Sequence, residues 1–312
     1  MHSLENSVKT VLVTGGAGFI GSHVVESLIL AGKEVIVLDN FSVGRLENLK
    51  GLPLEIVECS ILNKSQVDKA VKRADAVIHL AAMVSVPGSI KEPAKCAEIN
   101  VIGTINLLAA CQKHGIRRFV QASSSAVYGT EPGQPKQESS HTAPSTPYAA
   151  SKLSAEHFAA SAASLGLSCS SLRFFNVYGP RQDPSSPYSG VVSIFLSRVK
   201  EGQPITIFGD GGQTRDFIFV KDVASHVVQC LDRTPDFHEV LNVASGESMT
   251  VYELAKEVQK AMGREVEIRF AAPRLGDIYN SSACVRNLRA ADSHRPVPFS
   301  QGLLETVASL AF

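Results

Sequence analysis

The stretch Thr14-Gly15-Gly16-Ala17-Gly18-Phe19-Ile20-Gly21 decides the fold of this chain. A short apolar run, residues 10–14, precedes it, and an apolar stretch over residues 18–31 follows, which predicts a strand, a turn and a helix. Glycines in such a turn let a pyrophosphate approach the backbone, and the helix N-terminus stabilises its charge. The segment therefore predicts a dinucleotide site; a tight turn without a ligand is the alternative interpretation.

Outward from this turn, apolar strands and helical patterns alternate. Strands are predicted at residues 34–38, 54–59, 76–80, 119–122 and 168–175, and helices at residues 64–72, 93–114 and 148–164, where Pro147 suits a helix start. This order indicates an α/β fold, a doubly wound parallel Rossmann sheet with helices on both faces. Turn chemistry after Asn176 indicates a smaller C-terminal α/β lobe, with helices near 191–201, 223 and 251 and strands near 205 and 217. We expect an NAD-binding domain over residues 8–176 and a substrate lobe over residues 177–312, interleaved with the last strands, with the substrate between them.

Composition excludes several classes. The 312 residues carry a formal net charge of zero, which argues against a nucleic-acid partner. The six cysteines are scattered, as expected of buried thiols in a reducing cytosol. The nine histidines lack the spacing of metal ligands, so no metal site is expected. No signal peptide and no membrane span are expected, and we expect a cytoplasmic protein.

Asp39 ends the second predicted strand, as the acid that meets the adenosine ribose does in dinucleotide-binding turns. A carboxylate there accepts hydrogen bonds from ribose hydroxyls and repels a 2′-phosphate, which favours NAD over NADP. Arg45 lies in the following loop and is the counter-argument, since an arginine can hold that phosphate. Asp39 carries more weight because of its place at the strand end.

Tyr148 and Lys152 stand four residues apart in a predicted helix, so both side chains lie on one face. An ammonium beside a phenol favours the phenolate, and we expect the pKa of Tyr148 to fall towards neutrality. Such a base takes a hydroxyl proton while hydride leaves the carbon. Hydroxyls at Ser123, Ser124 and Ser125 close the preceding strand, where they face the ligand edge of a doubly wound sheet. Leu80, Ala81 and Ala82 leave room for the cofactor, and His79 is expected to be a hydrogen-bonded core residue.

Several motifs in order complete the pattern: Thr14 to His23, Asp39-Asn40, His79 to Ala82, Ser123 to Gly129, Tyr148-x-x-x-Lys152, Arg173 to Pro180 and Thr214 to Phe217. The sequence resembles the extended short-chain dehydrogenase/reductases, and within them the UDP-hexose 4-epimerases, over nearly the whole chain. The resemblance implies NAD recycled within each turnover and a 4-keto sugar formed and reduced in place. Tyr148 would take the 4-hydroxyl proton, Ser124 would be the catalytic serine, and Lys152 would hold the nicotinamide ribose.

The same resemblance implies the binding residues. Those of the cofactor are Gly15, Gly18, Phe19, Ile20, Gly21, Asp39, Asn40, Ser42, Gly44, Ser60, Ile61, Leu80, Ala81, Ala82, Asn100, Tyr148 and Lys152. Those of the UDP-sugar are Val86, Ser124, Ser125, Tyr148, Asn176, Thr206, Phe208, Arg215, Val251, Arg274, Asp277 and Ser281. Arg215, Arg274 and Asn176 would grip the diphosphate, and Phe208 and Asp277 the uridine. On spacing alone, each arginine reads as a surface charge.

Residue differences within the family define the alternatives. Ala126 stands where the dehydratases and decarboxylases of the family carry an acidic residue, so these two activities are disfavoured. A reductase of the same fold and a non-catalytic NAD-binding sensor are further alternatives. Ser281 stands at a gate beside the sugar 2-substituent, and its small size predicts acceptance of UDP-GlcNAc and UDP-GalNAc beside UDP-Glc and UDP-Gal. Ser60 replaces an acid that meets adenine, which predicts weaker NAD binding. The resemblance also implies a homodimer formed through the two helices that begin at Pro93 and Tyr148.

Overall fold

The computed structural model describes residues 8–183, 190–233, 235, 238–273, 278–292 and 294–310. It contains two compact units. The first comprises the chain to Val127, Pro144–Arg173 and Ala224–Leu241, and the second comprises Tyr128–Ala143, Phe174–Val223 and the chain from Asn242. The chain passes from the first unit to the second between residues 173 and 174, near the expected boundary at 176/177. Two segments depart from that boundary: residues 128–143 precede it but belong to the second unit, and residues 224–241 follow it but belong to the first.

A seven-stranded sheet runs through the first unit. Its order is β10 (Glu239–Val243), β6 (Ser168–Phe174), β5 (Arg118–Ser124), β4 (Ala76–His79), β1 (Thr10–Thr14), β2 (Glu34–Asp39) and β3 (Glu55–Glu58). The pairs β3–β2, β2–β1, β1–β4 and β4–β5 are parallel. Val11, Leu12 and Val13 of β1 are fully buried, as continuous apolar strands covered on both faces are. The order reverses beside β1, which confirms the doubly wound sheet and places the ligand edge at its carboxyl end.

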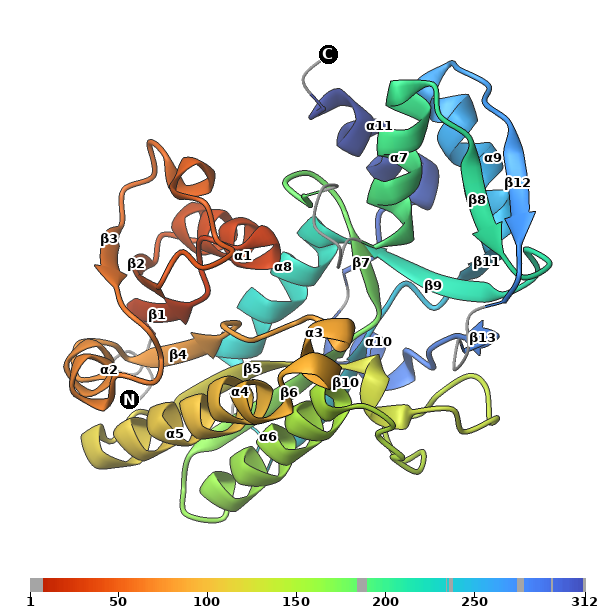
Figure 1. Ribbon diagram of the computed structural model, residues 1–312. Helices are drawn as coiled ribbons and strands as arrows, with labels where there is room; N and C mark the ends of the chain where they lie inside the picture. Colours follow the sequence, from red (N-terminus) through yellow and green to blue (C-terminus); the bar gives the residue numbers. More distant parts are fainter. Residues whose placement is uncertain are drawn as a thin grey trace. The chain divides into compact units, whose positions relative to one another are not determined.

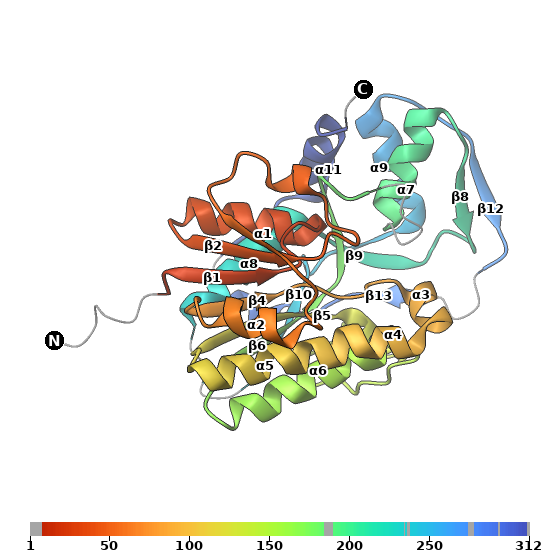
Figure 2. The same ribbon diagram turned by 60° about the vertical axis from the view of Figure 1, so that its left-hand side comes forward.

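Helices cover both faces of this sheet. They are α1 (Phe19–Leu30), α2 (Lys64–Val71), α3 (Val86–Lys91), α4 (Pro93–Ala97), α5 (Gly103–His114), α6 (Pro147–Ala163) and α8 (Val220–Gln229), which continues from the second unit. Figures 1 and 2 show α2, α5 and α6 along one face, with α1 on the other. Leu107, Cys111 and Ala159 from α5 and α6 pack with Leu12 and Phe119 of the sheet into one apolar core.

Helix α6 begins as its sequence predicts. Pro147 occupies the first turn, where its missing N–H costs no hydrogen bond. The Thr146 hydroxyl accepts a hydrogen bond from the Ala149 N–H at 3.2 Å, which caps the helix. The helix ends before Gly166, whose φ of +97° suits a glycine. These local signals fix the start of the helix that carries Tyr148.

The predicted helix over residues 93–114 is interrupted. A π-helical turn, Glu98–Ile102, separates α4 from α5. Contrary to the expectation that no stretch approaches a membrane span, Pro93–His114 is long and apolar enough by composition, and half of its apolar window is buried. Asn100 and Thr104 make hydrogen bonds within the first unit from this segment. These contacts favour its role as a core helix of this unit.

The second unit is built from shorter elements. Its strands are β7 (Asn176–Tyr178), β8 (Ile205–Phe208), β9 (Thr214–Phe219), β11 (Ser248–Thr250), β12 (Ile268–Ala271) and β13 (Asn280–Ser281), and its helices are α7 (Val191–Glu201), α9 (Val251–Met262), α10 (Arg286–Ala291) and α11 (Phe299–Ala308). Strand β9 pairs with β7, β11 and β13, and β8 pairs with β12. The sequence predicted a turn from Tyr178; instead Asn176–Tyr178 pairs with β9, and the Tyr178 side chain is buried.

Candidate active site

The carboxyl end of β5 is joined to α6 by a row of polar contacts. The Gln121 Nε2 donates to the Ala155 carbonyl at 3.0 Å, Lys152 Nζ to the Ala122 carbonyl at 2.9 Å, Ser123 Oγ to Glu156 Oε1, and Ser124 hydrogen-bonds Tyr148. Each residue from 121 to 124 therefore meets α6. The row brings together Ser124, Tyr148 and Lys152, the three residues that the sequence proposed as catalytic.

The first turn of α6 has an additional anchor. The Tyr148 N–H donates to the Ser89 hydroxyl at 3.1 Å, and that hydroxyl donates to the Val86 carbonyl at 2.7 Å. Ser89 is fully buried in α3. Helix α3 thereby sets the position of the Tyr148 backbone. Sequence reasoning missed Ser89, because a serine in a short Pro- and Gly-containing segment is typical of a turn.

The pKa of Tyr148 departs from the expected direction. Burial raises it above the ordinary value for a phenol, and the Ser124 hydrogen bond opposes that effect. The sequence-based expectation that Lys152 brings the Tyr148 pKa towards neutrality is therefore wrong for the protein alone. The reason is that the same close packing that brings the helix onto β5 desolvates the phenol more strongly than the neighbouring groups stabilise its anion.

Lys152 is desolvated as well. Its side chain is buried, and burial lowers the pKa of its ammonium to about 8, while Cys96 and Glu156 act to raise it. The ammonium donates to a main-chain carbonyl and is still charged near neutral pH. It can therefore present a positive charge to an adjacent oxygen.

The Lys152 ammonium predicts a pH-dependent stability. The unfolded chain holds this proton up to about pH 10.5 and the folded chain releases it near pH 8, so between these values the unfolded state binds more protons. Stability should therefore rise with pH through this window, at about 1.4 kcal/mol per pH unit and by no more than about 3.5 kcal/mol in total. Urea unfolding of the wild type and Lys152→Met from pH 7.5 to 10.5 measures it. Parallel curves for the two proteins would contradict the shift.

The three serines divide their roles. Ser123 contacts Glu156, Ser124 contacts Tyr148 and accepts the Ala126 N–H at 3.2 Å, and Ser125 begins the 3₁₀ turn Ser125–Tyr128. The structure therefore places Ser124, not its neighbours, beside the phenol.

Two glycines of the N-terminal turn are required by close approach of the backbone. A Cβ on Gly15, whose φ is +71°, would lie 2.6 Å from the Ala81 nitrogen. A Cβ on Gly21 would lie 2.1 Å from the Gly15 carbonyl oxygen. Gly18 precedes α1, which begins without a side-chain cap. The first N–H groups of α1, from Phe19 and Ile20 onward, belong to a helix end of the kind that binds phosphate.

Asp39 lies beside this turn. Its carboxylate is buried and accepts the Ala17 N–H at 3.0 Å and the Phe41 N–H at 2.9 Å. A Cβ on Gly44 would approach that carboxylate to 3.0 Å, so this glycine keeps the space beside it. The Asn40 side chain accepts the Ser42 N–H at 3.2 Å and orders the same loop. The carboxylate therefore has a fixed position at the end of β2.

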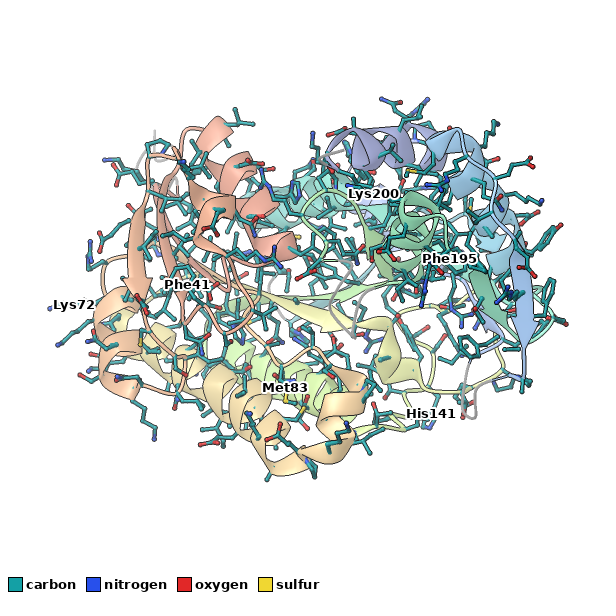
Figure 3. All side chains as sticks on the ribbon, turned by 45° about the horizontal axis from the view of Figure 1, so that its top comes forward. Phe41, Lys72, Met83, His141, Phe195 and Lys200 are labelled. Carbon is teal, nitrogen blue, oxygen red and sulfur yellow. The ribbon has the colours of Figure 1, made fainter. Side chains whose placement is uncertain are left out.

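Asn100 fixes the loop after β4. Its Oδ1 accepts the Met83 N–H at 2.7 Å, and its Nδ2 donates to the Met83 carbonyl at 3.0 Å and to Ser151 at 2.9 Å. Met83 is labelled in Figure 3. Asn100 lies in the π-helical turn, a feature frequent at functional sites. The side chain thereby joins the loop that includes Ala81 and Ala82 to the helix that carries Tyr148.

The remaining residues near the carboxyl edge of the sheet hydrogen-bond or pack within the protein. His79 is buried between the hydroxyls of Thr14 and Thr104, at 2.7 and 3.0 Å, and burial lowers its pKa to about 3, which confirms it as a neutral core residue. Ser60 caps a turn by accepting the Leu62 N–H, and Ile61 packs beside Gly103. The described cysteines are free thiols, and Cys96, Cys111, Cys169 and Cys230 are buried as predicted.

The second unit holds the other residues proposed for the sugar nucleotide, besides Val86, Ser124, Ser125 and Tyr148 of the first unit. Asn176 Nδ2 donates to the Asp216 carbonyl at 2.9 Å, and Arg215 donates to the Thr214 and Tyr279 carbonyls. Ser281 of β13 is the register partner of Arg215 in β9, so the proposed gate and a proposed diphosphate ligand are neighbours. Thr206 and Phe208 lie in β8, and Val251 begins α9. Arg274 and Asp277 lie outside the described residues.

The residues of the first unit fit a dinucleotide. A close-packed glycine turn leads into an uncapped helix end, and a fixed carboxylate stands beside it. The sequence model of the NAD dependent epimerase/dehydratase family matches residues 11–244, three quarters of the chain. The chain belongs to this family. It is therefore an extended short-chain dehydrogenase/reductase enzyme, and its cofactor is NAD.

Relatives within the family carry related activities. A UDP-glucose 4-epimerase of Mycolicibacterium smegmatis is 37% identical over 304 residues, 95% of this chain and 96% of that protein. A UDP-N-acetyl-alpha-D-glucosaminuronate decarboxylase of Bacillus cytotoxicus is 33% identical over 96% of this chain and 97% of its own length. The solved UDP-N-acetylglucosamine 4-epimerase of Methanobrevibacter ruminantium, in complex with UDP-N-acetylmuramic acid, has a TM-score of 0.92 at 39% identity, covering 96% of this chain and 97% of that chain.

Proposed function

We propose that this enzyme inverts C4 of a UDP-hexose through a transient 4-keto intermediate, acting on UDP-Glc/UDP-Gal and also on UDP-GlcNAc/UDP-GalNAc. The observation that carries the proposal is the contact of Ser124 with Tyr148 at the ligand edge of the sheet, one helical turn from the Lys152 ammonium. Relatives named as epimerases for both glucose and N-acetylglucosamine nucleotides support it.

Bound NAD would supply a reversible hydride acceptor for C4 of the sugar. The glycine turn and Asp39 would hold the cofactor's pyrophosphate and adenosine ribose. Tyr148 would remove the proton of the 4-hydroxyl and later give it back, so atoms and electrons balance over one turnover. Ser124 would stabilise the phenolate by donating a hydrogen bond to it. This hydrogen bond opposes the rise in the Tyr148 pKa that burial causes.

A decarboxylase is the second candidate, and the 33% identical decarboxylase favours it. Ala126 counts against it. The Ala126 N–H donates to Ser124, so the backbone of residue 126 lies next to the proposed centre, and the resemblance puts an acid at this position in decarboxylases and dehydratases. No carboxylate is supplied from this position. The epimerase is therefore the better-supported activity.

Product analysis separates these candidates. Purified protein is incubated with UDP-Glc, UDP-GlcNAc or UDP-GlcA, without added NAD and again with it, and products are identified by proton NMR. We expect UDP-Gal from the first and UDP-GalNAc from the second. Release of CO₂ from UDP-GlcA with no epimer from either hexose would replace the epimerase by a decarboxylase. A need for added NAD would show the weaker cofactor binding predicted from Ser60.

Ser281 determines the expected substrate range. Its small side chain lies partly buried beside Arg215, and a tyrosine there would fill the space proposed for an N-acetyl group. Ser281→Tyr should lower kcat/KM for UDP-GlcNAc by about 10²-fold, the effect of roughly 3 kcal/mol of steric exclusion, and leave UDP-Glc turnover within a few-fold. Ser281→Ala is the matched control and should retain both activities. Equal UDP-GlcNAc turnover by Ser281→Tyr and wild type would remove this residue from the gate.

A further inference from the structure

A buried ion pair lies behind the proposed catalytic residues. Glu156 and Arg173 are 4% and 5% exposed. The Arg173 Nε donates to Glu156 Oε1 at 3.0 Å and its Nη2 to Oε2 at 2.8 Å, a two-pronged contact. Ser123 donates a further hydrogen bond to the same carboxylate. Buried charges are tolerated only when paired and hydrogen-bonded, and this carboxylate has a partner on each oxygen.

The pair adjoins the site through short connections. Glu156 stands four residues after Lys152 on α6, and therefore on the same helix face. Ser123 lies in β5 between Ala122, whose carbonyl accepts the Lys152 ammonium, and Ser124, which contacts Tyr148. The pair thus holds both the strand end and the helix turn that position the ammonium.

We propose that Glu156, fixed by Arg173 and Ser123, is a positioning residue that keeps Lys152 protonated and directed at the end of β5. The inference rests on the proposed role of Lys152. The inference adds to the proposed function a requirement for a negative charge one helical turn from the Lys152 ammonium.

The charges around Lys152 support this assignment. Burial lowers the Lys152 pKa to about 8, and Glu156 and Cys96 of α4 oppose that effect. His79 of β4 also faces the ammonium and is neutral near pH 7, since its pKa is lowered to about 3. The segments packed against α6 carry further charged side chains, namely Lys91, Lys95, Glu98, Lys113, His114, Arg117 and Arg118. Arg118, at the far end of β5, is buried, and the others are exposed or only partly buried. Glu156 is thus the carboxylate whose charge acts on Lys152.

Selective labelling measures this effect directly. The protein is labelled with ¹³Cε-lysine, the Lys152 signal is assigned by its loss in Lys152→Met, and its shift is followed by NMR from pH 6 to 11. Glu156→Gln leaves the Arg173 cation to face Lys152, so the titration midpoint should fall by about one pH unit. Arg173→Gln leaves the carboxylate alone, so the midpoint should rise.

Opposite shifts distinguish charge from packing. If the pair only filled space, both substitutions would loosen the same contact and move the midpoint in one direction or leave it unchanged; either result would overturn the proposal. Because removing one partner of a buried pair can prevent folding, the double variant Glu156→Gln/Arg173→Gln and Ser123→Ala are titrated too. The double variant should lie between the wild type and Glu156→Gln. A midpoint equal to that of the wild type would again reject the proposal.

Activity provides a second measurement. With UDP-Glc as substrate, the alkaline decline of kcat should begin at lower pH in Glu156→Gln than in the wild type, by the same interval as the NMR midpoint. A wild type that converts none of the UDP-sugars would contradict the proposed function. The NMR titration would still decide the role of Glu156, so the two failures are distinguishable.

Discussion

Tyr148→Phe is expected to lower the rate of UDP-Glc epimerisation by about 10³-fold while leaving NAD bound. The substitution removes one hydroxyl, the group that contacts Ser124, and keeps the ring and the Ser89 anchor to its backbone. The hydride acceptor and the other binding residues are unchanged, but the 4-hydroxyl proton has no acceptor. The loss should therefore appear in kcat, with little change in KM.

The measurement is steady-state epimerisation together with titration of NAD by calorimetry. Tyr252→Phe is the matched control, because Tyr252 lies on α9 of the second unit and its ring is 42% exposed. It should retain wild-type rates. Turnover by Tyr148→Phe within tenfold of the wild type would require a different base, and loss of NAD binding in that variant would mean that the phenol also holds the cofactor.

Gly21→Ala is expected to abolish NAD binding at micromolar concentrations and with it all turnover. The new methyl group would lie 2.1 Å from the Gly15 carbonyl oxygen and 2.8 Å from the Gly16 Cα, both of them backbone atoms of the same turn. Backbone cannot rotate away as a side chain can, so the turn must open or α1 must shift. Overpacking of this kind costs about 1–3 kcal/mol of folding stability, and the phosphate-binding geometry is lost with it.

Fluorescence or calorimetric titration with NAD tests this expectation, with urea unfolding to separate cofactor loss from unfolding. Gly133→Ala is the matched control, because its Cβ would meet no atom within 4 Å and its φ is not positive. It should bind NAD as the wild type does. Retained affinity in a folded Gly21→Ala protein would show that the turn accommodates the methyl group and would weaken the assignment of this turn to the pyrophosphate.

The sequence was sufficient for the parts of the site that depend on local chemistry. The glycine turn, Asp39 and the spacing of Tyr148 and Lys152 follow from a strand, a turn and a helix close together in the chain. Such short-range features predicted the alternating strands and helices of the first unit and its doubly wound sheet. They also predicted that His79, at the end of a buried strand, is a hydrogen-bonded core residue.

Other features depend on contacts between distant residues. Ser89 meets Tyr148 across 59 residues, and Ser281 meets Arg215 only because β13 pairs with β9. The balance that raises the Tyr148 pKa is a matter of burial, which residue spacing does not show. The π-helical turn around Asn100 was hidden because its apolar pattern reads as one continuous helix. In each case the missing information was packing, not residue type.

Strand β13 has a consequence for how this enzyme can change. Gln134 holds the main chain on both sides of Ser281, donating to the Asn280 carbonyl at 2.8 Å and accepting the Ser282 N–H at 3.1 Å. The backbone at the proposed gate is therefore held by hydrogen bonds that do not use the Ser281 side chain. Residue 281 can therefore be substituted without loss of the hydrogen bonds from Gln134 that hold its backbone. If Ser281 lines the sugar site as proposed, substrate range can change by single substitutions here, and this position is a starting point for laboratory evolution towards larger 2-substituents.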